Sequence, residues 1–441
     1  SGLTTAQLDG LNTDQLRSLT GSQVAAMTTA QFAALSSDDL NSLTTGQFGS
    51  ITADQLNARS SIASLTTDDL VALNADTVAG LKTAAIQALT TSQVTQLSAT
   101  QIKSLTTDQL NAMEQADVES LTTSQVAALK ADQVGALSTT QLGRLSTAQV
   151  SALSGAHISR LSTDSVKSLS STQVAAINVT ALRSLTADQL NALDTADLAG
   201  MGTAQVASLR ADQLQGMTTS QLNVLTTGQV TALSDAQLGS LTTTQVASLK
   251  TDAIATLNSE QVTGLKVEQL DALSTTQISK ISSSAIAGLS GGQIGSLSTD
   301  KLSVLTTGQT QSLTNTQIRA LTTGQMAGLS TASLAALTTT QIGSFNANQL
   351  NALSTAQVAS LETADIAKLG ASIVSALSND NITAMTSGQV KALDSTQLKA
   401  LSSAQLNALD TADLAAMGTS QIQALSTGQV ASLSTDRLTV L

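Results

Sequence analysis

The sequence L-T-T-D-Q-L-N-A at residues 105–112 returns with one substitution as L-T-A-D-Q-L-N-A at residues 185–192. Degenerate copies of the same eight-residue unit, called an octad here, fill the chain. Seven octads cover residues 3–58 and forty-seven more cover residues 65–440. Between them, residues 59–64 form a six-residue unit, R-S-S-I-A-S. A fixed short period of this kind predicts a repeat architecture in which neighbouring units bury one continuous core.

Each position of the octad has a preferred residue type. Position 1 is Leu, Ile, Met or Phe in all 54 octads, and position 6 is apolar in all but one, where Thr310 stands. Position 2 is Ser, Thr, Asp or Asn in 44 octads, position 5 is Gln in 36, and position 8 is Ala, Ser or Gly in 45. The preferences therefore define a motif of the form L-[ST]-x-x-Q-[VLI]-x-[AS].

These preferences match the start of a helix. A hydroxyl at position 2 with Gln or an acid at position 5 is a capping box, and the apolar residues at positions 1 and 6 are the two halves of a hydrophobic staple. Position 6 and position 1 of the next octad are three residues apart, so both would lie on one helix face. The small residue at position 8 would allow close approach of a neighbouring unit. We therefore expect one helix of about five to seven residues in every octad, a length that follows from the eight-residue spacing of the helix starts.

The placement of charge supports the same interpretation. Helix N-termini favour acidic residues and C-termini favour basic ones. Of 31 acidic residues, 28 lie at positions 2 to 5, and of 19 basic residues, 11 lie at positions 7 or 8. Five basic residues at position 2 run against the trend: Lys82, Lys130, Arg210, Lys250 and Lys266.

The predicted fold is an all-α solenoid of very short helices, one per octad. Helices this short do not persist alone in water, so their apolar edges must pack against neighbouring units. The alternative is a β-solenoid, because Thr and Val are frequent and β-branched residues favour strands. A tight β-coil needs Gly, Asn or Asp at fixed corners, whereas Gly is scattered over five octad positions here.

We expect residues 1–441 to be one continuous array. Residues 1–2 read as positions 7 and 8 of a preceding octad, and Leu441 reads as position 1 of a following one. Soluble arrays carry atypical polar terminal repeats, and neither end has one. The sequence thus suggests a window of a longer array. Within it, the unit at residues 59–64 lacks two residues and places Arg59 where a core leucine is expected, which indicates either a hinge or site, or a tolerated deletion.

Composition argues against several classes of partner and chemistry. The chain has no Cys, no Pro, no Trp and no Tyr, and only three Phe. The absence of Cys excludes disulfides and thiolate metal sites. A net charge of −12, spread evenly, disfavours nucleic acid and anionic membranes, because both select basic patches. No apolar run approaches the length of a transmembrane span.

The residues that could carry chemistry are explained by capping. His157 is the one histidine, occupies the Gln position of L-S-G-A-H-I-S-R, and lacks partners for a metal site. The carboxylate pairs Asp38/Asp39 and Asp68/Asp69 fall at positions 4 and 5, where a helix start favours acids. Sequons begin at Asn178 and Asn381, a number that chance explains. We therefore expect no catalytic residue, no cofactor site and no metal site.

The octads at residues 121–128, 145–152 and 185–192 resemble arrays of very large bacterial surface or secreted proteins of the adhesin-like class. The resemblance implies an extracellular or cell-surface structural protein: a fibre, stalk or matrix filament that works by regular stacking and self-association into homo-oligomers or filaments, without catalysis. The alternative is a binding module whose hydroxyl rows grip a glycan, a cell surface or another regular surface. Haem binding does not carry over, because the chain has one His and its Met residues lie at core positions.

Overall fold

The computed structural model describes residues 2–441, and the chain divides into two compact units, Ser1–Val224 and Leu225–Leu441. The boundary falls between position 8 of one octad and position 1 of the next. Residues 2–441 hold 54 helices, one in each octad, and the six-residue unit at residues 59–64 has none. None of the described residues is in a strand. The all-α prediction is therefore confirmed, and the β-solenoid alternative is wrong.

The first unit contains helices α1 to α27. Their bounds are α1 Thr5–Asp9, α2 Thr13–Arg17, α3 Gly21–Ala25, α4 Thr29–Ala34, α5 Ser37–Ser42, α6 Thr45–Phe48, α7 Ala53–Asn57, α8 Thr67–Ala72, α9 Ala75–Ala79, α10 Thr83–Gln87, α11 Thr91–Gln96, α12 Ala99–Ser104, α13 Thr107–Ala112, α14 Gln115–Ser120, α15 Thr123–Ala128, α16 Ala131–Gly135, α17 Thr139–Arg144, α18 Thr147–Ser151, α19 Gly155–Ser159, α20 Thr163–Lys167, α21 Ser171–Ala176, α22 Val179–Leu182, α23 Ala187–Asn191, α24 Thr195–Gly200, α25 Thr203–Ser208, α26 Ala211–Gly216 and α27 Thr219–Asn223.

The second unit contains helices α28 to α54. Their bounds are α28 Thr227–Thr231, α29 Asp235–Ser240, α30 Thr243–Ser248, α31 Thr251–Ala255, α32 Ser259–Thr263, α33 Val267–Ala272, α34 Thr275–Lys280, α35 Ser283–Gly288, α36 Gly291–Ser296, α37 Thr299–Ser303, α38 Thr307–Ser312, α39 Asn315–Ala320, α40 Thr323–Gly328, α41 Thr331–Ala336, α42 Thr339–Ile342, α43 Ala347–Asn351, α44 Thr355–Ser360, α45 Thr363–Lys368, α46 Ala371–Ser375, α47 Asn379–Thr383, α48 Ser387–Ala392, α49 Ser395–Ala400, α50 Ser403–Leu406, α51 Thr411–Ala415, α52 Thr419–Ala424, α53 Thr427–Ala431 and α54 Thr435–Leu438.

Helix α15 shows how the octad makes its helix. Thr122 is the N-cap with an extended backbone, and its hydroxyl accepts from the Gln125 N–H at 3.2 Å. The Gln125 Oε1 accepts in return from the Thr122 N–H at 2.8 Å. The helix ends at Ala128, and its C-cap is Leu129, position 1 of the next octad, whose N–H donates to the Val126 carbonyl. Both parts of the predicted capping box are present, so its role in starting the helices is confirmed.

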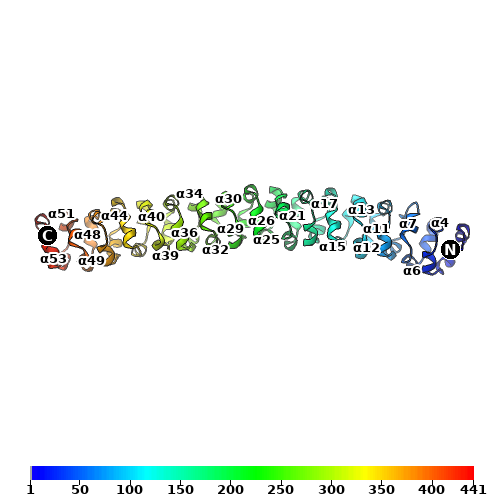
Figure 1. Cartoon of the computed structure of the whole chain (residues 1–441), viewed down its shortest axis with the longest axis horizontal. Helices are drawn as coiled ribbons and strands as arrows, with labels where there is room; N and C mark the ends of the chain where they lie inside the picture. Colours follow the sequence, from blue (N-terminus) through cyan, green and yellow to red (C-terminus); the bar gives the residue numbers. More distant parts are fainter. Residues whose placement is uncertain (1) are drawn as a thin grey trace. The chain divides into compact units, whose positions relative to one another are not determined.

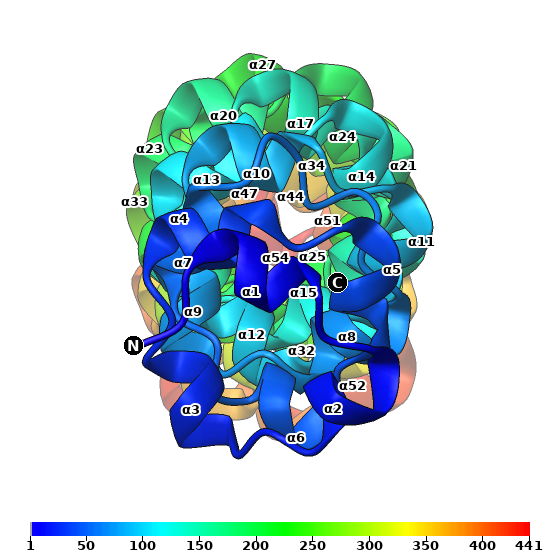
Figure 2. The ribbon, with the colours of Figure 1, turned by 90° about the vertical axis from the view of Figure 1, so that its right-hand side faces the viewer.

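Within each unit the helices wind in successive turns, and a helix packs against the helix three octads further along the chain. In the end-on view of Figure 2, α3 lies beside α6 and α4 lies beside α7, and both pairs are in contact. Figure 1 shows the same winding from the side. Residues at positions 1 and 6 point inward. In α15, for example, Val126 is 1% exposed and Leu129 is 4% exposed. The predicted continuous apolar core is therefore present inside each unit.

Close approach of successive turns explains the small residue at position 8. A Cβ added to Gly216 would lie 2.7 Å from the Cβ of Ala187, which is position 3 of an octad in the preceding turn. A Cβ added to Gly80 would lie 2.6 Å from the Cβ of Ala53. Real Cβ atoms do not approach this closely, so a larger side chain at these sites would push the turns apart.

The six-residue unit keeps the winding in register. Helices α6 and α8, which flank it, are in contact, as are α7 and α9, although they are only two helices apart in the chain. The unit therefore occupies one place in the turn without forming a helix. Ile62 fills the core place of position 6 and is 1% exposed, and the Leu65 N–H donates to the Ile62 carbonyl. Arg59, expected at a core leucine site, is only partly buried.

Candidate functional site

The glutamine at position 5 is the most widely repeated polar group of the interior. Its side-chain oxygen caps its own helix, and its side-chain amide can donate elsewhere. In α15, Gln125 Nε2 donates to the carbonyls of Val94 and Leu97, both at 2.8 Å. Val94 lies in the last turn of α11, four helices earlier, and Leu97 is the C-cap of that helix. One side chain therefore joins the start of one helix to the end of another in the preceding turn.

This cross-turn bond recurs through both units. The glutamines at position 5 from Gln47 to Gln221, and from Gln261 to Gln429, each donate from Nε2 to at least one main-chain carbonyl of the preceding turn. The acceptors lie mainly at positions 6 and 1, where carbonyls at a helix C-terminus lack a full set of helical partners. Because the glutamines are buried, losing the donor would leave these carbonyls without solvent as a substitute.

Several substitutions at position 5 keep this donor. His157 is 5% exposed; its Nδ1 accepts from the Ser154 N–H at 3.1 Å, and its Nε2 donates to the Leu129 carbonyl at 2.9 Å. Asn381 Nδ2 donates to the Leu350 carbonyl at 2.8 Å, and Arg437 Nε donates to the Leu409 carbonyl at 3.1 Å. His157 is thus a substituted capping residue, as predicted, and it also makes the cross-turn bond.

Arg59 supplies the same donor to the six-residue unit. Its Nη1 donates to the carbonyls of Phe32 at 3.1 Å and Leu35 at 2.9 Å, which are position 6 and position 1 acceptors. The unit has no glutamine, so Arg59 replaces one. Burial lowers the pKa of the Arg59 guanidinium, and its Nε has no hydrogen-bond partner. The main chain of Arg59 stands at a leucine site, as predicted, because its N–H donates to the Leu56 carbonyl like that of a position 1 residue. Its charged end, however, reaches the carbonyls of the preceding turn.

At Asp117 and Asp413, an aspartate at position 5 reverses the direction of the cross-turn bond. Thr91 Oγ1 donates to Asp117 Oδ1 at 3.0 Å, and Ser387 Oγ donates to Asp413 Oδ1 at 2.9 Å. Each hydroxyl belongs to position 3 of the octad three earlier. Burial raises the pKa of the carboxyls of Asp117, Asp365 and Asp413. The octads of these three residues stay joined to the preceding turn, but burial of the carboxyl group disfavours its charged form.

The other residues singled out in the sequence have local explanations. Asp39 and Asp69 accept from the N-cap hydroxyls of Ser36 and Thr66, as capping predicts. At the sequons, Asn178 Nδ2 donates to the Leu153 carbonyl, and Asn381 is buried. Thr310 is 3% exposed, and its hydroxyl has no partner. Among the described residues, no three His, Asp or Glu side chains gather where they could hold a metal ion.

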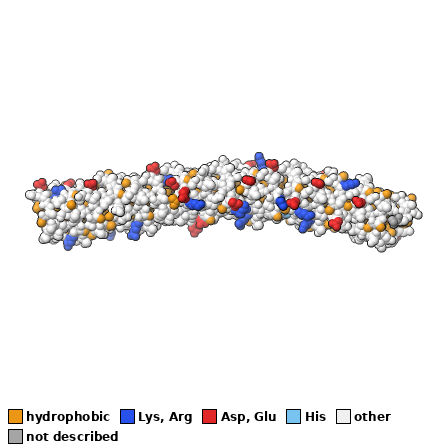
Figure 3. All heavy atoms as spheres, viewed as in Figure 1, with side chains coloured by type: hydrophobic (Ala, Val, Ile, Leu, Met, Phe, Trp, Pro, Cys, Tyr) orange, Lys and Arg blue, Asp and Glu red, His pale blue; other side chains and the backbone are white. Residues whose placement is uncertain are grey.

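The outer surface is made largely of small uncharged side chains. Positions 2, 3, 4 and 7 are mostly exposed, and in the face shown in Figure 3 the charged groups are few and lie among uncharged atoms, some alone and some in small groups of both signs. Position 2 hydroxyls are engaged in caps, so the exposed hydroxyls outside the caps belong mainly to positions 3 and 4. Residues 2–441 contain no helix that is both long and apolar enough to span a bilayer.

Comparison with known proteins identifies the repeat. No curated protein matches the chain. A solved structure, "Structure of APUM23-GGAAUUGACGG", aligns over 95% of this chain and 86% of its own at 13% identity, with a TM-score of 0.18, a likeness too weak to carry an argument. The ALTTAQ repeat family matches residues 1–37, 62–99, 110–147, 126–163, 190–227, 267–299, 327–363, 358–395 and 407–441. These matches cover more than half of the sequence, and the chain therefore belongs to the ALTTAQ repeat family.

Proposed function

We propose that the chain is a structural segment of an extracellular or cell-surface protein, where it serves as a stalk, fibre or matrix filament. The observation that carries the proposal is the repeated bond from the glutamine amide to main-chain carbonyls of the preceding turn. In α39, Gln317 Nε2 donates to the Ile286 carbonyl at 2.8 Å and to the Leu289 carbonyl at 2.7 Å. Because the same bond recurs in most octads, load placed on one turn passes to the next through buried main-chain contacts.

The surface supports a spacing role rather than a catalytic one. Among the described residues, the large apolar side chains that are exposed lie far apart in the chain: Leu3, Val71, Val179, Val267 and Leu438. Contiguous apolar patches mark binding surfaces, whereas scattered single residues do not. The resemblance to arrays of bacterial surface proteins supports the proposed location.

Self-association into filaments is part of the proposal. Gln7, Gln15 and Gln23 lie in the first turn and are exposed, whereas Gln47 and the position-5 glutamines that follow it are mostly buried against the preceding turn. The carbonyls at positions 1 and 6 of the last turn are the same kind of acceptor that glutamines bind elsewhere. When residues 1–441 are purified as a separate segment, a second copy placed end to end would pair these donors and acceptors, and contacts of this open kind generate filaments.

Electron microscopy of the purified chain across a concentration series tests self-association. We expect filaments that lengthen with concentration, and we expect a Gln7→Glu, Gln15→Glu, Gln23→Glu variant to form shorter ones, because the carboxylates cannot donate to carbonyls. Thr13→Ala, an exposed change in the same turn, is the control. Particles of fixed size at every concentration would remove self-association from the proposal.

The mechanical role is tested separately by pulling single molecules from both ends. We expect the chain to resist extension and then to lengthen in discrete steps, because turns held by several glutamine bonds open together. Smooth extension at low force, as an unstructured chain gives, would contradict the structural role. This test does not depend on whether filaments form.

A further inference from the structure

The glutamine bonds are interrupted over most of a turn at two places. The first seam, residues 59–88, comprises the six-residue unit and helices α8 to α10, whose position-5 residues are Asp69, Thr77 and Ala85. The second seam, residues 361–384, comprises α45 to α47, whose position-5 residues are Asp365, Ile373 and Asn381. All other interruptions between Gln31 and Gln429 span one or two octads.

A run of this length matters because a turn holds between three and four octads. Helices contact partners three octads away, and a glutamine such as Gln125 reaches acceptors three and four octads back. An isolated interruption, such as Ser333, lies between Gln325 and Gln341, and both of these donate to the preceding turn. At the seams, neighbouring octads cannot compensate in this way.

Other side chains bridge the first seam in place of glutamines, and among them Asn74 Nδ2 donates to the Gly49 carbonyl at 3.2 Å. The Arg59 guanidinium donates to two carbonyls of the preceding turn, and Thr77 Oγ1 donates to the Ile51 carbonyl at 2.7 Å. Asn57 Nδ2 donates to the Gly80 carbonyl at 2.8 Å, and its Oδ1 accepts from the Lys82 N–H at 2.8 Å. Neither Asp69 nor Ala85 has a side-chain hydrogen bond to the preceding turn.

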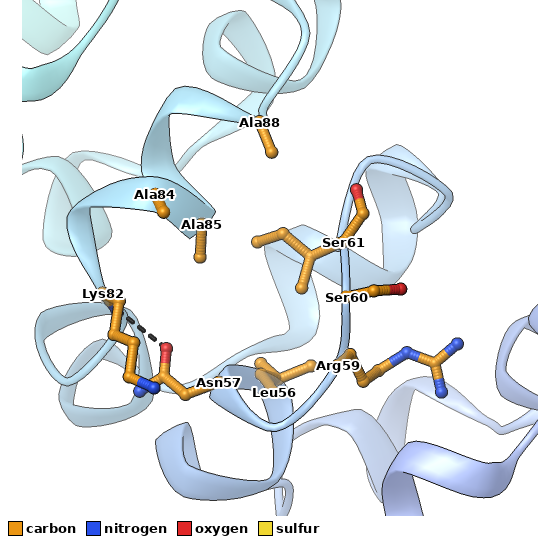
Figure 4. A pocket seen from close by; sticks show the side chains of 10 residues that line it. Leu56, Asn57, Arg59, Ser60, Ser61, Lys82, Ala84, Ala85 and Ala88 are labelled. Carbon is orange, nitrogen blue, oxygen red and sulfur yellow. Dashed lines mark hydrogen bonds between the residues drawn. The ribbon is translucent and has the colours of Figure 1, made fainter.

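The packing of the first seam is also incomplete. A hollow lies beside Ala85, between α10 and the six-residue unit, and Figure 4 shows Ala84, Ala85 and Ala88 on one side of it. Arg59 points away from the hollow. The hollow lies where a glutamine at residue 85 would extend toward Leu56 and the six-residue unit. Unfilled space removes dispersion contacts, so it weakens the seam further.

The second seam has a similar pattern. Asp365 accepts a side-chain hydrogen bond from Thr339, Ile373 has no polar group to offer, and Asn381 donates to the Leu350 carbonyl. Asn351 Nδ2 donates to the Ala376 carbonyl at 2.8 Å, and its Oδ1 accepts from the Ser378 N–H at 2.8 Å. Both seams thus depend on an asparagine at position 7 of the preceding turn.

We propose that the two seams are built-in opening points, at which each unit of the array opens first while the turns around them stay intact. In a repeat array stability is a sum of local terms, so opening begins where coupling between neighbours is weakest. The proposal goes beyond the structural role and does not depend on filament formation or location.

Limited proteolysis of the full chain with elastase tests the proposal. Elastase cleaves after small residues, which every octad contains, so the place of cleavage reports local opening rather than sequence. Apart from cuts within four octads of either end, we expect the first cuts, mapped by mass spectrometry, to fall within residues 59–88 and 361–384. First cuts spread evenly along the chain, or concentrated elsewhere, would overturn the proposal.

A substitution that closes one seam sharpens the test. We expect Ala85→Gln to slow cleavage within residues 59–88 about tenfold, which corresponds to about 1.4 kcal/mol, and to leave the second seam unchanged. The matched control is Ser333→Gln, which also lies beside a hollow but between two intact glutamines. It should leave both sites of first cleavage unchanged. If Ala85→Gln folds with the same helix content and cleavage of the first seam is not slowed, the assignment of that seam to missing glutamine bonds is wrong.

Discussion

Residues 89–152 and residues 59–88 belong to the same unit and have the same octad period, but they are joined to the preceding turn in different ways. In residues 89–152, glutamine occupies position 5 in all octads except that of Asp117, and each glutamine donates to a carbonyl of the preceding turn. Residues 59–88 are instead joined to the preceding turn by the side chains of Arg59, Thr77 and Asn74, and by Asn57 of that turn. The helices themselves are alike. The comparison shows that helix formation and turn-to-turn coupling are separable functions of position 5.

The largest effect should come from making the regular stretch resemble the seam. A Gln133→Glu, Gln141→Glu, Gln149→Glu variant keeps the capping oxygen in α16 to α18 and removes three consecutive donors. Each buried acceptor left unpaired costs about 1–3 kcal/mol, and the carboxylates add repulsion from the carbonyls. We expect elastase to cut first within residues 130–152, a new site. Cuts that remain confined to the original seams would show that cross-turn donors do not set local stability.

A smaller effect is expected at Arg59. Replacing it by Met keeps the aliphatic stem and removes the donors to the Phe32 and Leu35 carbonyls, so cleavage of the first seam should accelerate by about tenfold or more, from a cost of about 1–3 kcal/mol. Arg59→Lys should fall between the two, because one ammonium can still donate to a carbonyl. Equal rates for wild type and Arg59→Met would mean that the guanidinium bonds contribute nothing.

The asparagine at position 7 gives a finer test of compensation. Asn57 Oδ1 accepts from the Lys82 N–H, because that octad has no glutamine to do so. At the equivalent place near Asn191, the Thr218 N–H already donates to Gln221 Oε1. The Oδ1 of Asn191 therefore has no partner. Asn57→Ala should cost about 1 kcal/mol. In the Ala85→Gln background the cost should shrink, because the introduced glutamine would accept the Lys82 N–H instead.

A double-mutant cycle in thermal unfolding, followed by circular dichroism, measures this coupling. Asn191→Ala is the matched control and should lose only the bond to the Gly216 carbonyl. Additive effects of Asn57→Ala and Ala85→Gln would rule out the proposed exchange between the two residues.

The smallest effect should be a dependence on pH. Burial raises the pKa of Asp117, Asp365 and Asp413, and for the first two the neighbouring Glu114 and Glu362 act in the same direction. The folded chain therefore binds these protons more tightly than the unfolded chain. Stability should rise slightly as pH falls from neutral toward the ordinary aspartate pKa of 3.8. The Tm should increase slightly over this range, and an Asp→Asn variant at all three sites should lose that increase.

The local structure could be predicted from the sequence because the octad specifies it locally. Ser or Thr at position 2, Gln at position 5 and apolar residues at positions 1 and 6 interact within one helix, and the helices, caps and core positions follow. The donor role of the Gln125 amide could not be predicted in the same way, because its acceptors lie 28 and 31 residues away and depend on how many octads complete a turn.

One signal in the sequence does indicate this second role. A capping box accepts Glu as well as Gln, yet position 5 is Gln in 36 octads and Glu in none. A purely local cap does not explain this choice, whereas a required donor does. His157, Asn381 and Arg437 point the same way, because each keeps an N–H donor at position 5.

The most direct test is hydrogen exchange, measured by mass spectrometry, on Gln125→Glu. The substitution keeps an oxygen to cap α15 and removes the donor to the Val94 and Leu97 carbonyls of α11. If the glutamine joins turns, amides of both α11 and α15 will exchange faster than in wild type, although the two acceptors lie 31 and 28 residues away in the sequence. Faster exchange in α15 alone, with α11 unchanged, would show that the glutamine is only a local cap and would contradict the account.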